Sequence, residues 1–513
     1  MNLFADFASN IAIGFHEAVS ISNLWYCFLG VFFGCLVGVL PGLGALVAIS
    51  LLLPLTYHMP TSGALIMLAG VYFGVDYGGG TCSILLGVPG TSGSAVNVLD
   101  GFPMTKQGRG GIALFMKCIA SLWGSAVGIL LLMFLAPVLS NLALDFGAAE
   151  YFSLILLGLI AVSTVGQGSP IKGVAMMVVG LLCGVIGTDM YTGGERFTFG
   201  QPELLDGLGF ISVAMGLFAV TEVIKAAGAE SHRPAQQSFR LRDQLPTRED
   251  WKRSWAPMLR GSALGAAFGA LPGTSSGMTT FLAYAVEKRV SKHPEQFGKG
   301  AIEGIASPEA CNNAGVGTAF IPTLTLGIPG DAIMALILGA MIMQGIVPGP
   351  QLISSNPSLF WGLIVSFWIG NIFLVILNIP LIGMWVRLLA IPYHLMYPAI
   401  ILFTCIGVYS TKNSTFDLYI LLAFGFIGYF MMQLRFEVVP LLLGMILGPM
   451  LEDQFRRAML ISDGSFGVFL ERPISATVLI FTAALIIWSL WAYFRNRAKR
   501  AEMAQAIEHE ASV

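Results

Sequence analysis

Long apolar segments separated by short polar connections dominate the sequence. Most of them approach the roughly 20 residues that an α-helix needs to cross the hydrocarbon core of a bilayer. In the first half they lie at about 24–40, 43–57, 61–76, 112–139, 150–165, 171–187 and 208–225. In the second half they lie at about 257–271, 273–286, 331–347, 358–379, 396–410, 416–434 and 438–450, and a last span at 474–494 has no counterpart. This pattern predicts an all-α polytopic membrane protein with an extra C-terminal transmembrane helix.

Pro-Gly breaks interrupt the apolar pattern twice in each half. Gly87-Val88-Pro89-Gly90 is echoed 240 positions later by Gly327-Ile328-Pro329-Gly330, and Pro41-Gly42 and Pro272-Gly273 lie upstream of these two copies. Proline removes a backbone donor, and glycine allows turns that other residues resist. Inside a membrane, broken helices are tolerated only where they face protein or a wet cavity. We therefore expect a re-entrant hairpin at 81–103, a broken region at 300–330, and a transport site between two repeats.

The order of segments and breaks predicts four parts. They are a first transmembrane repeat at 1–225, a polar linker at 226–256, a second transmembrane repeat at 257–450, and a C-terminal helix with a basic tail at 451–513. Basic residues concentrate in the linker and the tail, which places both in the cytoplasm.

Loop charges predict that the two repeats are inverted. The loop at 57–60 carries no Lys or Arg, whereas its counterpart at 287–300 carries four. The loop after the first broken region carries Lys106 and Arg109, whereas residues 344–358 after the second carry none. By the positive-inside rule, corresponding loops lie on opposite sides of the membrane, with the N-terminus in the periplasm and the C-terminus in the cytoplasm. The alternative is chance, because short loops carry few charges.

Composition narrows the class of protein. Of the 513 residues, 56% are hydrophobic and only 11% are charged, well below the roughly 25% of soluble domains. The net charge of -2 gives no electrostatic case for binding nucleic acid. The seven cysteines form no CxxC pair, and the chain has neither a phosphate-binding GxxxxGK[ST] loop nor an HExxH zinc motif. An enzyme would need a convergent set of reactive groups, and we expect none.

Small and hydroxyl-bearing residues cluster after the Pro-Gly breaks. A helix that starts after such a break offers free N–H groups and the positive end of its dipole, which suits an anion. The alternative is that each Ser or Thr only satisfies local backbone or permits close packing. The predicted substrate-binding residues are Gly42, Gly90, Thr91, Ser92, Gly273, Thr274, Ser275, Ser276, Asn312, Asn313 and Gly330.

Acidic and amide residues near the breaks are candidates for a coupling ion. Ionisable residues at membrane depth are functional candidates by default, and amide and backbone oxygens suit Na⁺. The candidates are Asp76, Glu309, Asn313 and Asp331. For the acids the alternative is a helix-capping role at the membrane interface. No cofactor is expected, apart from Na⁺ as a bound ion.

The broken regions contain no Lys or Arg, so helix ends and hydroxyls would have to hold an anionic substrate. We expect the peptide N–H groups at Gly90-Thr91 and Gly273-Thr274 to face its carboxylates. Each helix end contributes up to ~2 kcal/mol in a favourable site. Binding should therefore be weak without a co-bound cation or a delivering protein.

Longer motifs surround these breaks in both halves. They are Gly38-Val39-Leu40-Pro41-Gly42-Leu43-Gly44, Tyr77-Gly78-Gly79, Ile84-Leu85-Leu86-Gly87-Val88-Pro89-Gly90-Thr91, Asp100-Gly101-Phe102-Pro103, Leu271-Pro272-Gly273, Ser307-Pro308-Glu309-Ala310-Cys311-Asn312-Asn313-Ala314 and Leu324-Thr325-Leu326-Gly327-Ile328-Pro329-Gly330. These motifs resemble the large membrane subunit of the tripartite tricarboxylate transporters, the TctA family. The likeness runs through roughly residues 15–450, and Gly87 departs from it, since Asn is expected there in many relatives.

The resemblance implies a secondary transporter subunit in the bacterial inner membrane. It would import carboxylates such as citrate, or related di- and monocarboxylates, by symport driven by a Na⁺ or H⁺ gradient. Its expected partners are a small membrane subunit and a periplasmic solute-binding protein that delivers the substrate. The resemblance also implies a mobile domain that carries paired hairpins. The alternative function is a channel with a pore at the repeat interface.

Overall fold

The computed structural model describes residues 3–40, 42–143, 146–165, 169–226, 245–274, 276–388 and 393–511. The chain divides into two compact units. The larger unit comprises Met1–Leu144 and Gly209–Tyr429, and the smaller unit comprises Asp145–Leu208 and Phe430–Val513. Each unit is described below by itself.

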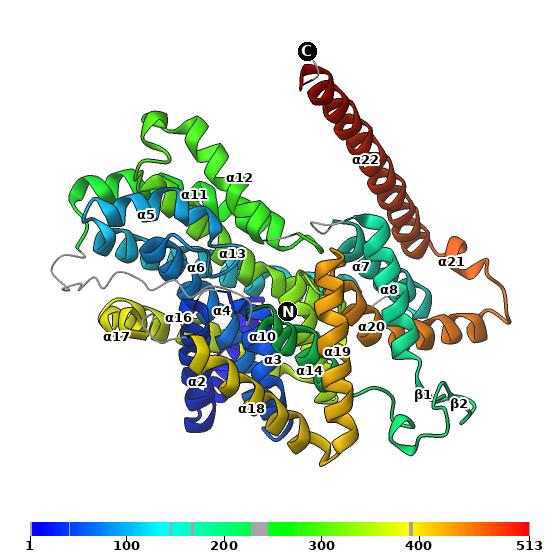
Figure 1. Cartoon of the computed structure of the whole chain (residues 1–513). Helices are drawn as coiled ribbons and strands as arrows, with labels where there is room; N and C mark the ends of the chain where they lie inside the picture. Colours follow the sequence, from blue (N-terminus) through cyan, green and yellow to red (C-terminus); the bar gives the residue numbers. More distant parts are fainter. Residues whose placement is uncertain are drawn as a thin grey trace. The chain divides into compact units, whose positions relative to one another are not determined.

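The larger unit is built almost entirely of α-helices (Figure 1). Its first segment holds α1 (Leu3–Ala18), α2 (Ile21–Val39), α3 (Gly44–Tyr57), α4 (Thr61–Leu86), the short 3-10 helix η1 (Ala95–Asn97), α5 (Val98–Lys106) and α6 (Gly110–Ala143). Its second segment begins with α9 (Phe210–Met215), the π-helical turn η3 (Gly216–Val220) and α10 (Thr221–Ala226). It continues with α11 (Arg248–Gly269), α12 (Ser276–Val290), η5 (Pro294–Gln296), α13 (Glu303–Leu326), α14 (Ala332–Met343), α15 (Gln351–Ser355), α16 (Pro357–Asn378), α17 (Ile382–Leu388), α18 (Tyr393–Lys412) and α19 (Thr415–Gln433).

The smaller unit is helical apart from one short hairpin. It contains α7 (Ala148–Val165), α8 (Pro170–Gly184), η2 (Pro202–Leu204), α20 (Val438–Ile461), α21 (Val468–Glu471) and α22 (Pro473–Ala511). Strands β1 (Gly187–Thr188) and β2 (Glu195–Arg196) pair antiparallel. Helix α22 is the long C-terminal helix in Figure 1, and its early part corresponds to the predicted extra span at 474–494.

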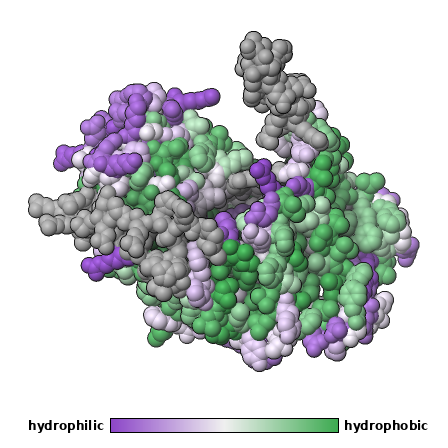
Figure 2. Space-filling view, in the orientation of Figure 1, coloured by the Kyte–Doolittle hydropathy of each residue, from purple (hydrophilic) through white to green (hydrophobic). Residues whose placement is uncertain are grey.

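The prediction of an all-α polytopic membrane protein is confirmed. Within the described residues, six helices are long and apolar enough to cross a membrane, namely Ile21–Val39, Gly110–Asn141, Pro357–Asn378, Thr415–Gln433, Val438–Ile461 and Pro473–Arg495. Large apolar side chains such as Phe403, Ile406 and Phe426 are exposed on α18 and α19. Figure 2 shows a broad apolar surface and a separate hydrophilic area over α12. An apolar surface of this kind is stable against lipid rather than water.

Two helix pairs, α2 with α4 and α11 with α13, pack through the same register of glycines. In the first pair Gly30, Gly34 and Gly38 face the backbone of Met67, Val71 and Val75, and in the second Gly261, Gly265 and Gly269 face that of Ser307, Cys311 and Gly315. The three facing positions in α13 each lie 240 residues after their counterparts in α4. A Cβ at any of the six glycines would overlap the facing backbone, so only glycine permits this approach. Each half of the chain therefore contains the same packing unit.

The breaks are shorter than the sequence suggests. Helix α4 continues through Asp76 and the following glycines to Leu86, so only about 87–94 interrupts it. Helix α13 runs unbroken from Glu303 to Leu326 despite Pro308 and Pro322, and its interruption is confined to about 327–331. The prediction of a broken region over 300–330 was wrong in extent. Each internal proline removes one backbone bond, which the packing of neighbouring helices tolerates.

The loops after α5 and α12 lie together at one end of the larger unit. The side chain of Gln107 donates a hydrogen bond to the Lys299 carbonyl over 2.8 Å. The buried carboxylate of Asp100 accepts hydrogen bonds from the backbone N–H groups of Gly298, Gly300 and Ala301 over 2.8 to 2.9 Å. A carboxylate that accepts three backbone donors fixes a loop firmly.

The loops after α3 and α14 also lie together. Thr61 donates to the side chain of Gln344 over 3.3 Å, and Gln344 donates to the Thr56 carbonyl over 2.5 Å. The His58 ring nitrogen Nε2 lies 3.2 Å from the Ser410 carbonyl oxygen. Equivalent loops of the two halves are therefore not neighbours, because the loop after α3 meets the loop after α14 and not the loop after α12.

The predicted four-part division remains a prediction. Most of the linker at 226–256 lies outside the described residues, although α11 already begins at Arg248. Its start is fixed by a capping box, in which Thr247 and Asp250 satisfy each other's backbone N–H groups.

Candidate functional site

The first break folds into a compact tip, residues 87–94, that closes on itself. Gly87 has a left-handed φ of 69°, which ends α4 at low steric cost. The Ser94 hydroxyl accepts hydrogen bonds from the Thr91 N–H over 3.0 Å and from the Ser83 hydroxyl over 3.0 Å. Gly90 lies directly against the backbone of Gly79, which brings the tip onto its own helix.

The second break, residues 327–331, closes in a similar way. Gly327 ends α13 with a φ of 71°. The Gly330 N–H donates to the Thr323 hydroxyl over 3.3 Å, and the Gly330 carbonyl accepts from the Gly273 N–H over 3.0 Å. The Asp331 carboxylate caps α14 by accepting a hydrogen bond from the Met334 N–H over 2.8 Å. Asp331 therefore has the helix-capping role that was the alternative to ion coupling.

Most of the peptide N–H groups predicted to face a substrate have partners in the protein. The Thr91 N–H donates to Ser94, the Gly273 N–H to the Gly330 carbonyl, and the Thr274 N–H to the Leu271 carbonyl over 3.4 Å. Because a committed donor cannot bind a carboxylate without rearrangement, this part of the prediction was wrong for the observed conformation. The hydroxyls after the first break close the tip instead of capping η1 or α5, neither of which has a side-chain cap.

Predicted site residues from the two halves of the chain nevertheless lie next to each other. The hydroxyls of Ser92 and Ser276 are 3.4 Å apart, and Gly277 lies against the backbone of Ser92. Ser92 is exposed and Thr274 and Ser276 are half-buried, so the meeting point is accessible from outside the protein. Ser275 lies outside the described residues.

Each tip also contacts the long helix of the opposite half at an equivalent position. Tyr72 of α4 donates a hydrogen bond to Asp331 of the second tip. Asn312 of α13, 240 residues after Tyr72, lies directly against Gly93 of the first tip. Each tip is therefore in direct contact with a buried helix of the other half.

A buried polar cluster lies around Glu309 of α13. Its carboxylate accepts from Asn97 and from the Ser121 hydroxyl over 2.7 Å, and the Asn313 amide reaches it at 3.5 Å. Asn313 also donates to the Glu309 carbonyl over 3.0 Å, as expected for two residues one turn apart in a continuous helix. The backbone carbonyls of Asn312 and Asn313 lie within this continuous helix. Only the side chains of the two residues can therefore contribute to a binding site.

Lys117 is a candidate functional residue that the sequence reasoning missed. It lies inside the apolar helix α6, and only 1% of its surface is exposed. Its ammonium donates to the Tyr77 carbonyl and to the Thr81 hydroxyl over 3.3 Å. Lys117 and the Glu309 carboxylate both border Gly80, and their charges interact. A lone lysine within the predicted span at 112–139 was the available signal.

Asp76 of α4 is the second buried acid, with 3% of its surface exposed. Its carboxyl group faces the amide of Asn312 and the hydroxyl of Thr91. The charge of Asp76 interacts with those of Glu309 and Asp331, and the charge of Glu309 interacts with that of Lys117. The fourth predicted ion-coupling residue, Asn313, contacts Glu309 directly.

The structure brings together most of the predicted substrate-binding residues, from both halves. Gly42 lies at the α2 break instead, where it has a φ of 92° and its nearest outside neighbour is Glu222. Among the described residues no group of three or more His, Cys, Asp or Glu side chains could hold a metal ion. Any cation at the site would need amide, hydroxyl or carbonyl oxygens as well.

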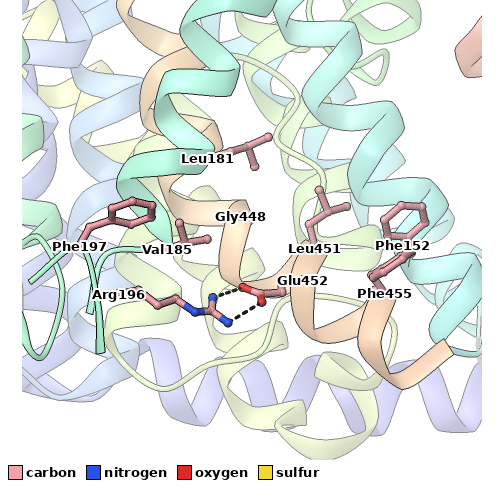
Figure 3. A pocket seen from close by; sticks show the side chains of 9 residues that line it. All are labelled: Phe152, Leu181, Val185, Arg196, Phe197, Gly448, Leu451, Glu452 and Phe455. Carbon is pink, nitrogen blue, oxygen red and sulfur yellow. Dashed lines mark hydrogen bonds and ion pairs between the residues drawn. The ribbon is translucent and has the colours of Figure 1, made fainter. Parts of the chain in front are cut away.

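A hollow also lies in the smaller unit, apart from these residues. It has a volume of about 480 Å³ and is lined mainly by apolar residues such as Leu181, Val185 and Phe455 (Figure 3). Its charged groups, Arg196 and Glu452, pair with each other at 2.9 Å. Because they satisfy each other, this hollow offers no free polar group for an ionic ligand.

Comparisons with known proteins agree with this architecture. The chain matches the "Tripartite tricarboxylate transporter TctA family" over residues 24–443. It is 48% identical over 492 residues to "Uncharacterized 52.8 kDa protein in TAR-I ttuC' 3'region" of Agrobacterium vitis, which covers 96% of this chain and 98% of the relative. It is 51% identical over 233 residues to "Uncharacterized protein in TAR-II ttuC' 3'region" of the same organism, covering 45% of this chain and 96% of the relative.

No solved structure matches the chain significantly. The family match spans both tips, the buried acids and Lys117, and it is a family of transporter subunits rather than enzymes. The chain is therefore a multi-pass membrane protein that belongs to the tripartite tricarboxylate transporter TctA family.

Proposed function

We propose that this chain is the large membrane subunit of a bacterial inner-membrane carrier that imports carboxylates. Citrate, or a related di- or monocarboxylate, is the proposed substrate, and a Na⁺ or H⁺ gradient drives the uptake. The observation that carries the proposal is the contact between the first tip and the start of α12. Segments that follow helix breaks in opposite halves meet at Ser92 and Ser276, and the neighbouring Gly93 lies against the buried amide of Asn312. Discontinuous helices that converge at mid-membrane are typical of secondary transporters.

The family belongs to a tripartite system, so we propose two partners, a small membrane subunit and a periplasmic solute-binding protein. The commitment of the Thr91, Gly273 and Thr274 N–H groups to protein acceptors supports weak binding by the subunit alone. A binding protein that delivers concentrated substrate would compensate for weak intrinsic affinity.

Loop contacts support an inverted arrangement of the two repeats. The basic loop after α5 contacts the basic loop after α12, through Gln107 and Lys299. The uncharged loop after α3 contacts Gln344, which follows α14. Equivalent helices therefore run in opposite directions, with the basic end in the cytoplasm by the positive-inside rule. The N-terminus is then periplasmic, and by the same rule the basic tail after Arg495 favours a cytoplasmic C-terminus.

This topology predicts a specific labelling pattern. We expect cysteines at Lys106 and Lys292 to be protected from an impermeant maleimide in intact cells, and a cysteine at His58 to react. Each is introduced where the partly exposed Cys183 and Cys405 have been replaced by serine. Labelling at position 292 from outside, with position 58 protected, would contradict the inverted orientation.

The proposed site predicts that the hydroxyls of Ser92 and Ser276 contribute to substrate affinity. We expect the double variant Ser92→Ala, Ser276→Ala to raise the KM for carboxylate uptake by about tenfold or more, because hydrogen bonds to a charged group contribute ~1.5–3 kcal/mol each. Uptake is measured in proteoliposomes that contain both membrane subunits, with the binding protein supplied outside. The control is Ser354→Ala, whose exposed hydroxyl bonds only to its own helix.

The same assay separates a carrier from a channel. A carrier saturates with substrate, needs the binding protein, and stops when the cation gradient is collapsed. Flux that rises linearly with substrate and ignores both the gradient and the binding protein would favour a pore at the repeat interface.

A further inference from the structure

Two hydrogen-bonding contacts join the segments that follow Ser92 and Ser276. The first arm is residues 92–106, which include η1 and α5, and the second arm is helix α12. The hydroxyls of Ser92 and Ser276 lie 3.4 Å apart at the start of the arms. Further along, the Tyr284 hydroxyl of the second arm donates to the Asp100 carboxylate of the first arm over 2.9 Å. Asp100 and Tyr284 each lie eight positions after the serine of their own arm, so both contacts join the same two segments.

Asp100 occupies a prepared carboxylate site in the second half of the chain. Its side chain is fully buried. Oδ2 accepts from Tyr284, and Oδ1 accepts from the backbone N–H groups of Gly298, Gly300 and Ala301 over 2.8 to 2.9 Å. Gly298 and Gly300 have positive φ angles of 83° and 106°, which let these N–H groups converge on one oxygen. Asp100 therefore ties the first arm to the second half through both of its oxygens.

The first arm is stiff between Ser92 and Asp100. Helix η1 continues into α5 without an intervening loop. Val96, between the two contacts, is fully buried in one apolar cluster with Tyr284. On the other side of the arm, Thr105 donates to the Ile84 carbonyl over 2.8 Å, which holds α5 against α4. The position of Asp100 therefore determines where Ser92 lies.

The two contacts differ in strength. The contact between Ser92 and Ser276 joins neutral hydroxyls at a distance that is long for O–H···O, and Ser92 is exposed to competing water. The bonds of Asp100 end on a buried carboxylate, and such charge-assisted bonds are roughly twice as strong as neutral ones. The stronger contact therefore sets the distance between the arms, and the weaker contact follows it.

We infer that Asp100 is a positioning residue, which holds the two arms so that the hydroxyls of Ser92 and Ser276 lie side by side. In this arrangement both hydroxyls can donate to the same carboxylate group of a substrate. The role in substrate binding rests on the proposed function, whereas the positioning of the two serines can be tested without transport.

The test measures how fast a disulfide forms between cysteines at the two serine positions. Ser92→Cys and Ser276→Cys are combined in the purified full-length subunit, with Cys183 and Cys405 replaced by serine. A mild oxidant is added, and the disulfide is counted after denaturation as the loss of two maleimide-reactive thiols. The hydroxyl oxygens are only 3.4 Å apart, so we expect rapid cross-linking while Asp100 is present. Each single-cysteine variant should lose no thiols.

Three further variants ask whether the bonds of Asp100 maintain this proximity. Asp100→Ala removes all of them and should slow cross-linking at least ~10-fold, since even one hydrogen bond to a charged group contributes this much. Asp100→Asn keeps an acceptor for the backbone N–H groups and lets the Tyr284 hydroxyl accept from the amide, so it should restore most of the rate. If Asp100→Ala does not fold, Tyr284→Phe breaks only the bond between the arms and should also slow the reaction.

Glu150→Ala is the matched control for a general loss of stability. Glu150 is another buried carboxylate that accepts a backbone N–H, that of Gly147 over 2.8 Å, and it pairs with Arg472 at 3.2 Å. It belongs to the smaller unit, whereas both arms belong to the larger one. We expect Glu150→Ala to lower the melting temperature and to leave the cross-linking rate unchanged.

The outcomes separate this inference from the proposed function. Asp100 does not position the serines if the double-cysteine protein with Asp100 fails to cross-link. The same holds if Asp100→Ala, or Tyr284→Phe in its place, cross-links at the full rate, or if Glu150→Ala slows the reaction as much. In the uptake assay, Asp100→Ala should raise the KM for carboxylate. If cross-linking slows but KM does not change, Asp100 positions the arms and the proposed substrate site is wrong.

Discussion

Replacing Gly265 with valine should prevent α11 from packing against α13 and leave little folded protein. A Cβ at this position would overlap the backbone carbonyl of Cys311, and a backbone carbonyl inside a helix cannot move aside alone. Overpacking a close helix contact typically costs ~1–3 kcal/mol and more where backbone must shift. The fraction of monodisperse protein after extraction in mild detergent, together with its melting temperature, measures the effect.

Gly315 provides the matched control on the facing helix. A Cβ there would meet its nearest atom, the Gly265 carbonyl oxygen, at an ordinary 3.5 Å. We expect Gly315→Ala to leave both yield and melting temperature near wild type. Gly34→Val, at the equivalent position of the first half, should behave like Gly265→Val. Equal tolerance of Gly265→Val and Gly315→Ala would mean that the two helices are not as close as described.

The sequence was sufficient to predict the helical membrane architecture and the location of the tips. Apolar segments of spanning length and Pro-Gly breaks are local signals, and both led to elements close to the observed ones. The glycine register was harder to see, because only contact between α2 and α4, and between α11 and α13, shows which of the 61 glycines matter. The N–H groups of Thr91 and Gly273 were misjudged, since their acceptors depend on how the tips fold back.

The buried cluster was predicted only in part, because its members come from distant parts of the sequence. Asp76 and Glu309 were recognisable as acids within apolar surroundings. Their different partners, Asn312 for the one and Ser121 for the other, require three-dimensional proximity between α4, α6 and α13. Lys117 is a different case, because a lysine inside an apolar span is conspicuous in the sequence alone.

The second prediction with a large expected effect concerns the buried ammonium group of Lys117. The variant Lys117→Met keeps the length of the side chain but removes the ammonium that bonds the Tyr77 carbonyl and Thr81. It leaves Glu309 without the charge that balances it. Removing one partner of a buried charge pair typically costs ~3–5 kcal/mol. We expect a clear fall in melting temperature and loss of uptake in the reconstituted system.

A double variant distinguishes charge from packing. Glu309→Gln in the Lys117→Met background removes the uncompensated carboxylate while keeping its hydrogen-bonding shape. The double variant should therefore recover part of the lost melting temperature, and the non-additivity gives the coupling between the two charges. Lys172→Met is the control for removing a lysine in general, because the half-buried Lys172 donates to the Leu434 carbonyl over 2.6 Å and lies over the Phe436 ring, with no acidic partner among the described residues. Lys117 does not balance the charge of Glu309 if Lys117→Met lowers the melting temperature no more than Lys172→Met does. The same conclusion follows if the change in melting temperature of the double variant equals the sum of the changes in the two single variants. The polar cluster would then have to keep its acid neutral by other means.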